Sequence, residues 1–145
     1  MAALRSVLGV ALVVAAALPA VPAEQAPKIA VIVGKSSKVE HVSKDDLREL
    51  YLRRRRLWPD GERALPVNLP SGTAVRERFS RLVLGRSSED LVAYWNGRYF
   101  EGITPPPVLP TPAAVRAYVA DEPNAIGYVP AEDAGTDCRV LLILE

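Results

Sequence analysis

The amino-acid sequence predicts an α/β fold, with a mixed or mainly parallel sheet flanked by helices. Strand-like and helix-like segments alternate along the chain, which is the order expected of such sheets. The first segment, residues 28–34 (KIAVIVG), is a continuous β-branched run typical of a strand buried on both faces. The chain has 145 residues and no internal repeat, so we expect one compact domain rather than two with a large cleft between them.

The first 23 residues have the pattern of a secretory signal. Arg5 precedes an apolar run over residues 7–18, and Val21-Pro22-Ala23 is a small-residue cleavage pattern. The run is short for a bilayer span, so a retained membrane anchor is the weaker alternative. We therefore expect cleavage near Ala23, a secreted, periplasmic protein, and a mature domain of residues 24–145 without an integral membrane segment.

Charge and the rare residue types exclude several classes of function. The chain has 18 basic (Lys and Arg) and 17 acidic residues, and Arg5 is the only charge in the first 23, so the mature part is near neutral and no nucleic-acid partner is expected. Cys138 is the only cysteine and His41 the only histidine, so we expect no disulfide, no metal site and no cofactor. The spacing of the serines near His41 indicates no hydrolytic triad, which predicts a protein that is not an enzyme.

A helix is predicted to begin after Ser43, because SKDD has the pattern of a capping box with Asp46. Leu47, Leu50 and Tyr51 give this helix an apolar stripe. It ends in four successive arginines, which the helix dipole stabilises at that end without any ligand. Docking of these arginines to an acidic partner or an anionic membrane surface is the alternative.

The second half of the chain continues the alternation. A turn at residues 58–61 (WPDG) and a strand at residues 65–69 lead into a helix that ends at Gly85, and Ser87 or Ser88 caps the next one. A connector with five prolines precedes the last helix, and strands at residues 125–130 and 139–144 complete the set. The residues predicted to pack these three helices into the core are Val75, Phe79, Leu82 and Val83, then Leu91, Val92, Trp95 and Tyr99, then Ala114, Val115, Tyr118 and Val119.

The turn Ser71-Gly72-Thr73 has the composition of an anion-binding site. It joins a strand to a helix, so the first N–H groups of the helix lack intrahelical acceptors, and the two hydroxyls either cap them or point to a phosphate-like oxygen. Ala74 offers a further N–H, and Arg76 a nearby positive charge. A plain capped helix is the competing interpretation.

The loop after the first strand contributes two further candidates. Gly34-Lys35-Ser36 matches the end of a phosphate-binding P-loop, but the glycine that this motif requires five residues earlier is Ile29. Ligands of α/β proteins tend to lie beyond strand ends. We therefore expect Lys35 and Ser36 as auxiliary contacts of the anion.

Four segments together carry a family resemblance, namely residues 28–61, 66–79 (PVNLPSGTAVRERF), 94–102 (YWNGRYFEG) and 123–130 (PNAIGYVP). They resemble the substrate-binding proteins of phosphate ABC transporters, in particular a small single-domain branch that is PstS-like. The resemblance implies one lobe of a type 2 periplasmic-binding fold and an exported solute-binding protein linked to ABC transport. It implies inorganic phosphate or a similar oxyanion as ligand, held at Ser71, Gly72 and Thr73, and an ABC permease or an envelope sensor protein as partner.

The chain departs from this family in two places. The family usually has an arginine a few residues ahead of the turn, where this chain has Val67-Asn68-Leu69, and the glycine-rich loop of the opposite lobe has no counterpart. Half of the usual cleft is therefore expected to be missing. The alternative function is a periplasmic adaptor or sensor-input module that has lost ligand binding and presents residues 53–56 or the proline-rich connector to an envelope protein.

Overall fold

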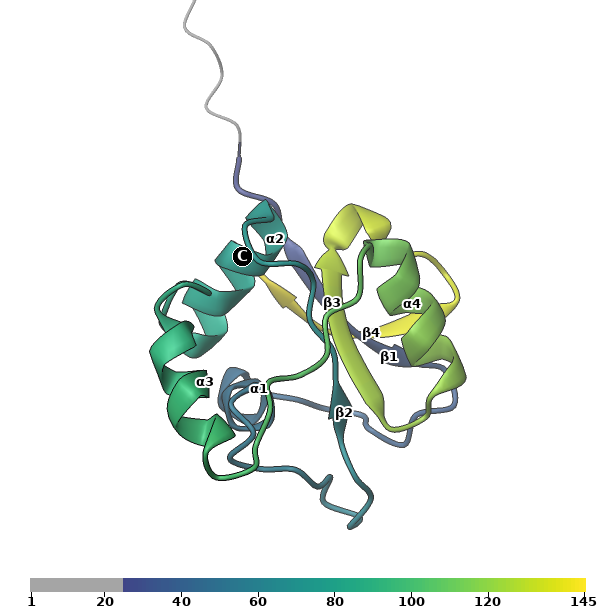
Figure 1. The fold of residues 1–145 in the computed structure, drawn as a ribbon. Coiled ribbons are helices and arrows are strands. Elements are labelled where there is room, and N and C mark those ends of the chain that lie inside the picture. The colour runs from purple at the N-terminus through teal and green to yellow at the C-terminus, as the bar shows by residue number, and fades with distance from the viewer. Residues whose placement is uncertain (1–24) are drawn as a thin grey trace, which may run out of the picture.

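The computed structural model describes residues 25–145. The predicted signal, residues 1–23, lies outside the described residues and stays a prediction. Within the described part, the strands form one sheet with helices on both of its faces (Figure 1). None of the helices there has the length and apolar character needed to cross a bilayer.

The sheet has four strands in the order β2-β3-β1-β4. β1 (Ile29–Gly34) lies between β3 (Ala125–Pro130) and β4 (Cys138–Leu144) and is antiparallel to both. β2 (Leu65–Pro66) is parallel to β3, and a 3-10 turn, Ala131–Asp133, follows β3. The prediction of an α/β fold is confirmed, and of the two sheet types that the sequence left open, the mixed one is observed.

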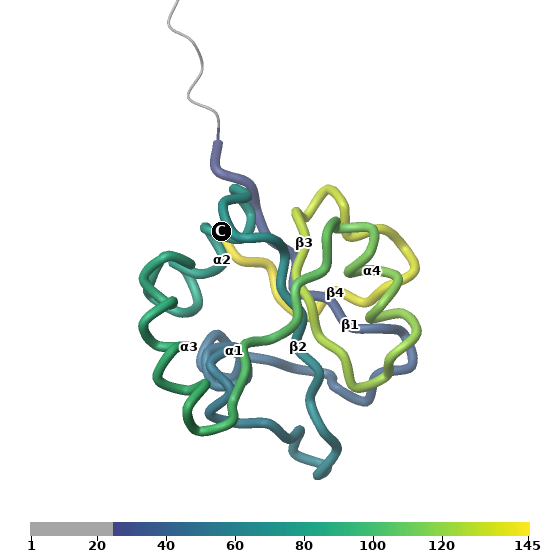
Figure 2. The backbone as a smooth tube through the Cα atoms, viewed as in Figure 1, coloured from purple at the N-terminus to yellow at the C-terminus, as the bar shows by residue number. Residues whose placement is uncertain are grey.

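The helices lie in two groups on either side of β3. α4 (Pro112–Asp121) packs against β3 and β1 on one face, whereas α1 (Lys44–Tyr51) and α2 (Ala74–Phe79) lie on the other (Figure 2). α2 continues as a π-helical turn, Ser80–Leu84, and α3 (Leu91–Tyr99) packs outside α1. Because both faces are covered, all six residues of β1 are buried, as its β-branched run predicts.

α1 begins as the sequence predicts. The Asp46 N–H donates to Ser43 Oγ at 3.0 Å, and the Ser43 N–H donates to Asp46 Oδ2 at 2.9 Å, which completes the capping box. The Ser43 N–H and the Ser43 hydroxyl, which donates to Asp46 Oδ2 at 2.8 Å, lower the pKa of the Asp46 carboxyl. Leu47, Leu50 and Tyr51 are buried beneath the helix, so its predicted apolar face is confirmed.

Three aromatic rings join α1 and α2 to the sheet. Phe79 stacks on Tyr128 of β3 with ring centroids 3.7 Å apart, and Tyr51 meets the edge of Phe79 at 4.8 Å. The Tyr51 hydroxyl donates to the carbonyl oxygens of Val67, at 3.0 Å, and Ile126, at 3.3 Å. Burial raises the pKa of Tyr51 well above its ordinary value and that of Tyr128 to about 12, so both phenols stay neutral over the physiological range.

α3 departs from the sequence prediction. Leu91 is buried, but Val92 is 55% and Tyr99 69% exposed, and Trp95 is half-buried. The expected packing of this helix into the core is therefore wrong for Val92 and Tyr99. The physical reason is that α3 lies outside α1, away from the sheet, where the Tyr94 hydroxyl donates to Leu52 O at 2.6 Å.

The predicted strand at residues 65–69 pairs over most of its length. Beyond β2, the Val67 N–H donates to Ile126 O of β3 at 3.0 Å. On its other side Asn68 pairs with the proline-rich connector, where its N–H donates to Pro107 O and its carbonyl accepts from the Leu109 N–H, both at 2.8 Å. The connector thus extends the sheet beside this segment and holds it in place.

Close approach between α4 and the sheet depends on two glycines. A Cβ on Gly127 would lie 2.5 Å from the Val115 side chain, and one on Gly34 would lie 2.2 Å from the backbone oxygen of Val119. Backbone cannot yield as a flexible side chain does. Gly34 is therefore a packing requirement of the fold.

We expect Gly34→Ala to lower the free energy of unfolding by at least about 2 kcal/mol, because α4 must move away from β1. The matched control is Gly97→Ala in α3, where an added Cβ meets nothing within 4 Å. That change should be neutral or stabilising by up to about 1 kcal/mol through helix propensity. Urea unfolding followed by circular dichroism measures both, and equal stability of the two variants would contradict the close packing.

Candidate anion site

The turn at residues 71–74 lies beyond β2, at the end of the sheet where β3 also ends, because β2 and β3 run parallel. Its four residues are all exposed. Gly72 has a φ of 84°, a left-handed conformation that favours glycine. Thr73 is the residue before α2, and the N–H groups of Ala74 and Val75 begin the helix without intrahelical acceptors.

The two predicted hydroxyls differ in what they contact. Thr73 Oγ1 donates to Pro70 O at 2.8 Å and makes no capping hydrogen bond to α2. Ser71 makes no side-chain hydrogen bond to another described residue and is exposed. Neither hydroxyl is used to cap the helix, so the interpretation of a plain capped helix does not describe this turn.

A buried polar layer supports the turn from below. The Tyr128 hydroxyl donates to Asn68 Oδ1 at 3.1 Å and accepts from the Leu69 N–H at 3.3 Å. Arg76 is only 7% exposed, and it donates from Nη1 to Leu69 O at 2.8 Å and from Nε to Ser80 Oγ at 3.3 Å. The residues just before the turn are thereby fixed through both their N–H and carbonyl groups.

Arg76 is therefore placed beneath the turn rather than beside it in solvent. Among residues 25–145 no carboxylate lies within ion-pair distance of its guanidinium. Its positive charge acts to lower the pKa of Tyr128 against the larger effect of burial. A buried cation without a carboxylate favours a negative group close by, and the open side of residues 71–74 is one place where such a group can bind.

Glu77 already supplies one negative group at this place. Its Oε1 accepts from the Gly72 N–H at 3.2 Å and from the Ser88 hydroxyl, and its Oε2 accepts from the Ser88 N–H at 3.2 Å. The hydrogen bond from the Ser88 hydroxyl is the first cause that lowers the pKa of Glu77. The carboxylate thus occupies a donor that the sequence assigns to a ligand, and it keeps its charge into mildly acidic solution.

A hollow of about 350 Å³ borders the start of α2. Its lining includes Ala74, Glu77 and two arginines, Arg78 and Arg81, neither of which forms an ion pair with another described residue. Sequence reasoning assigned the nearby charge to Arg76 and missed Arg81. The available signal was helical spacing, since Arg78 and Arg81 follow Ala74 by four and seven residues and so share its face.

Lys35 and Ser36 lie at the opposite end of the sheet from this turn. β1 is antiparallel to β3, and Ile32 pairs with Gly127, so the chain leaves β1 near the start of β3. The turn at residues 71–74 lies beyond the other end of β3. The structure therefore brings together Ser71, Gly72, Thr73, Ala74 and Arg76, and it does not bring Lys35 and Ser36 to them.

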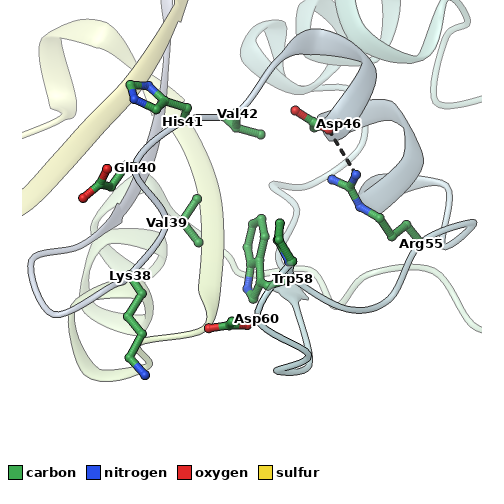
Figure 3. A pocket seen from close by; sticks show the side chains of 10 residues that line it. Lys38, Val39, Glu40, His41, Val42, Asp46, Arg55, Trp58 and Asp60 are labelled. Carbon is green, nitrogen blue, oxygen red and sulfur yellow. Dashed lines mark hydrogen bonds and ion pairs between the residues drawn. The ribbon is translucent and has the colours of Figure 1, made fainter.

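A second hollow, of about 270 Å³, lies near the start of β3 rather than near the turn (Figure 3). Trp58 faces it, and the indole N–H donates to Asn124 O at 2.9 Å. Asp46 and Arg55 form an ion pair of 3.0 Å on one wall. Its charged lining residues are Lys38, Glu40, Asp46, Arg55 and Asp60. This lining has no excess of positive charge, so it does not suit an anion.

Metal ligands and the single thiol form no candidate site within the described residues. Residues 25–145 contain no group of three His, Cys, Asp or Glu side chains that could hold a metal ion. Cys138 is buried, and burial is the first cause that raises the pKa of its thiol, which favours the inert protonated form.

Comparison with known proteins gives matches of structure alone. No protein-family model and no curated protein matches the chain. A protein from Clostridium perfringens, assigned as a phosphate ABC transporter substrate-binding protein and solved with bound phosphate, is 17% identical with a TM-score of 0.63, over 79% of this chain and 45% of that one. The fold is that of one lobe of a periplasmic binding protein.

Two further solved structures match the fold of this chain. An ABC-type phosphate transport receptor from Vibrio cholerae is 13% identical with a TM-score of 0.63, over 82% of this chain and 50% of that one. PstS from Borrelia burgdorferi is 13% identical with a TM-score of 0.57, over 79% of this chain and 47% of that one. The chain thus spans about half the length of the structures it matches. At these identities the likeness establishes the fold and not the ligand.

We expect Glu77→Gln to destabilise the protein by about 0.5–1 kcal/mol at neutral pH, because a neutral amide accepts more weakly from Gly72 and Ser88 and the site is partly exposed. The folded-state pKa of Glu77 is lowered, so its stabilising effect is present above the ordinary carboxyl range and is lost as pH falls below it. The difference between wild type and variant should shrink there. Thermal unfolding against pH measures this, with the exposed Glu89→Gln as control; an equal effect of both changes would contradict the role of Glu77.

Proposed function

We propose that the protein is an exported solute-binding protein, not an enzyme, which binds inorganic phosphate or a similar oxyanion at residues 71–77 and works with an ABC transporter. One observation carries this proposal. In a fold shared with phosphate ABC receptors, an exposed turn between a strand and a helix lies above the buried Arg76. Its two hydroxyls do not cap the helix, and the first N–H groups of the helix have no intrahelical acceptor.

The proposed mechanism is reversible binding. Ser71 and Thr73 donate through their hydroxyls, and Gly72 and Ala74 donate through backbone N–H groups. Arg76 contributes positive charge from beneath. For this to happen, the Thr73 hydroxyl must leave Pro70 O and an anion must displace the Glu77 carboxylate from the Gly72 N–H. Binding therefore competes with interactions that the unliganded protein already makes.

Charge beside the turn supports an anionic ligand further. Arg78 and Arg81 line the adjoining hollow and form no ion pair with any other residue in the described range. Lys35 and Ser36 are left out of the proposed site because the sheet separates them from it. The turn is exposed, and this chain spans only about half of each structure it matches, so we propose an affinity lower than a closed cleft provides, unless a second copy or a partner closes the site.

Isothermal titration with phosphate and then sulfate, at low ionic strength and in parallel with light scattering, tests the proposal. Saturable binding of at least one of these anions is expected. Binding by a dimer would indicate a cleft closed by a second copy, and binding by a monomer an open site. A folded protein that gives no heat with either anion would contradict the proposed function.

We expect the double change Ser71→Ala with Thr73→Val to weaken phosphate binding about tenfold or more, because two hydroxyl donors are lost. Both residues are exposed, so thermal stability should change little. The matched control is Lys35→Gln with Ser36→Ala, which removes a charge and a hydroxyl at the other end of the sheet. Phosphate affinity that falls equally in both variants would remove the turn from the site.

Export is tested separately. We expect the exported form to begin at Glu24, because cleavage is predicted after Ala23. Mass spectrometry of the protein recovered from outside the cytoplasm measures this. An intact first 23 residues in that fraction would support the retained anchor instead.

A further inference from the structure

Six arginines lie along two neighbouring hollows beside the C-terminal end of α1, and we call them the arginine track. One hollow, of about 330 Å³, lies where α1 meets the start of α3, and the other, of about 560 Å³, lies under the loop that follows α1. Arg54 lines both, so the track is continuous. Its members are Arg48, Arg54 and Arg86 in the first hollow and Arg54, Arg55, Arg56 and Arg63 in the second.

Half of this positive charge has no partner. Arg48, Arg54 and Arg55 form ion pairs with Asp45 at 3.5 Å, Glu49 at 3.5 Å and Asp46 at 3.0 Å respectively. Within residues 25–145, Arg56, Arg63 and Arg86 form none. The track therefore has an excess of positive charge although the chain as a whole is near neutral.

The helix C-cap and the hairpin after it set where these arginines lie, with Arg54, Arg56 and Arg63 exposed. Arg53 has a φ of 57°, a left-handed conformation that is uncommon for a residue with a side chain. The N–H groups of Arg54 and Arg55 then both donate to Glu49 O, at 2.9 and 3.0 Å, and the chain turns back at the helix end. Leu57 then pairs with Arg63, so the fold brings arginines from two segments to one hollow.

Exposed apolar side chains lie beside the charge. Leu57, which lines the larger hollow, is 52% exposed, and Phe100 is 90% exposed. Arg98 Nη2 donates to Arg53 O at 3.4 Å, which brings the end of α3, with Tyr99 and Phe100, next to the arginine run. In Figures 1 and 2 the end of α3 and the segment after α1 lie on the same side of the molecule.

We propose that the arginine track binds an acidic peptide segment of a partner protein. Guanidinium groups bind carboxylates in a bidentate manner, and arginine with exposed Tyr and Phe is the composition of protein-binding hot spots. The two neighbouring hollows are larger than one inorganic anion, and the exposed apolar side chain of Leu57 makes no favourable contact with such an anion. A peptide with carboxylates and an occasional apolar side chain matches both the positive charge and the exposed Leu57.

This surface is distinct from the proposed anion site. The hairpin with Leu57 and Arg63 precedes β2, whereas the turn at residues 71–74 follows its other end. A peptide on the track and an anion at the turn can therefore be bound at the same time. The two proposals can also fail independently, because changes to one set of residues leave the other set intact.

The test is fluorescence anisotropy with a labelled decapeptide of glutamates that contains two leucines, and with the same peptide carrying glutamine for glutamate. The acidic peptide should bind, and its affinity should fall with added salt. Arg56→Gln with Arg63→Gln should weaken binding about five- to thirty-fold, since two uncompensated charges are lost. The matched control, Lys38→Gln with Lys44→Gln, removes the same charge from exposed residues outside the track and should leave affinity within about twofold.

Several results would overturn the proposal. One is absence of binding by the acidic peptide, and another is equal loss in the two double variants. Arginine-dependent binding of anionic phospholipid vesicles or of a single-stranded oligonucleotide, without binding of the peptide, would assign the track to that polyanion instead. Ser71→Ala with Thr73→Val should leave peptide binding unchanged; weaker binding in that variant would mean that the track is not the peptide site.

Discussion

The stack of Phe79 on Tyr128 is the contact on which the rest of the structure depends. It presses α2 against β3 with ring centroids 3.7 Å apart, and the Tyr128 hydroxyl then reaches past the stack to Asn68 and to the Leu69 N–H. One side chain therefore joins the core to the segment that enters the turn. The turn at residues 71–74 is exposed and polar, yet its position is set by a buried aromatic ring.

The charges around the turn describe a site that is preorganised and partly self-occupied. Arg76 is held beneath it by Leu69 O and Ser80, while Glu77 accepts from Gly72 and Ser88. A carboxylate on these donors shows that they accommodate a negative group, and it also means that the proposed anion must compete with Glu77. This chain spans about half of each neighbour that shares the fold, so those proteins have more chain available to surround a ligand than this one offers.

Local features were predictable from the sequence and long-range ones were not. The capping box of Ser43 and Asp46 and the buried run of β1 follow from neighbouring residues alone, and both are confirmed. The position of Lys35 required the direction of β1 relative to β3, which long-range pairing decides. The exposure of Tyr99 depends on how α3 packs, and the inward path of Arg76 depends on the position of the Leu69 carbonyl oxygen. The spacing of residues along the sequence does not encode either of these.

The most direct test of the central claim is a titration of ¹⁵N-labelled protein with inorganic phosphate, followed by amide chemical shifts. The account predicts that the largest shifts occur at Gly72, Thr73 and Ala74, with further shifts at Ser88 as Glu77 is displaced, and none at Lys35. Shifts confined to the loop after β1, or no saturable shift at the turn, would contradict it.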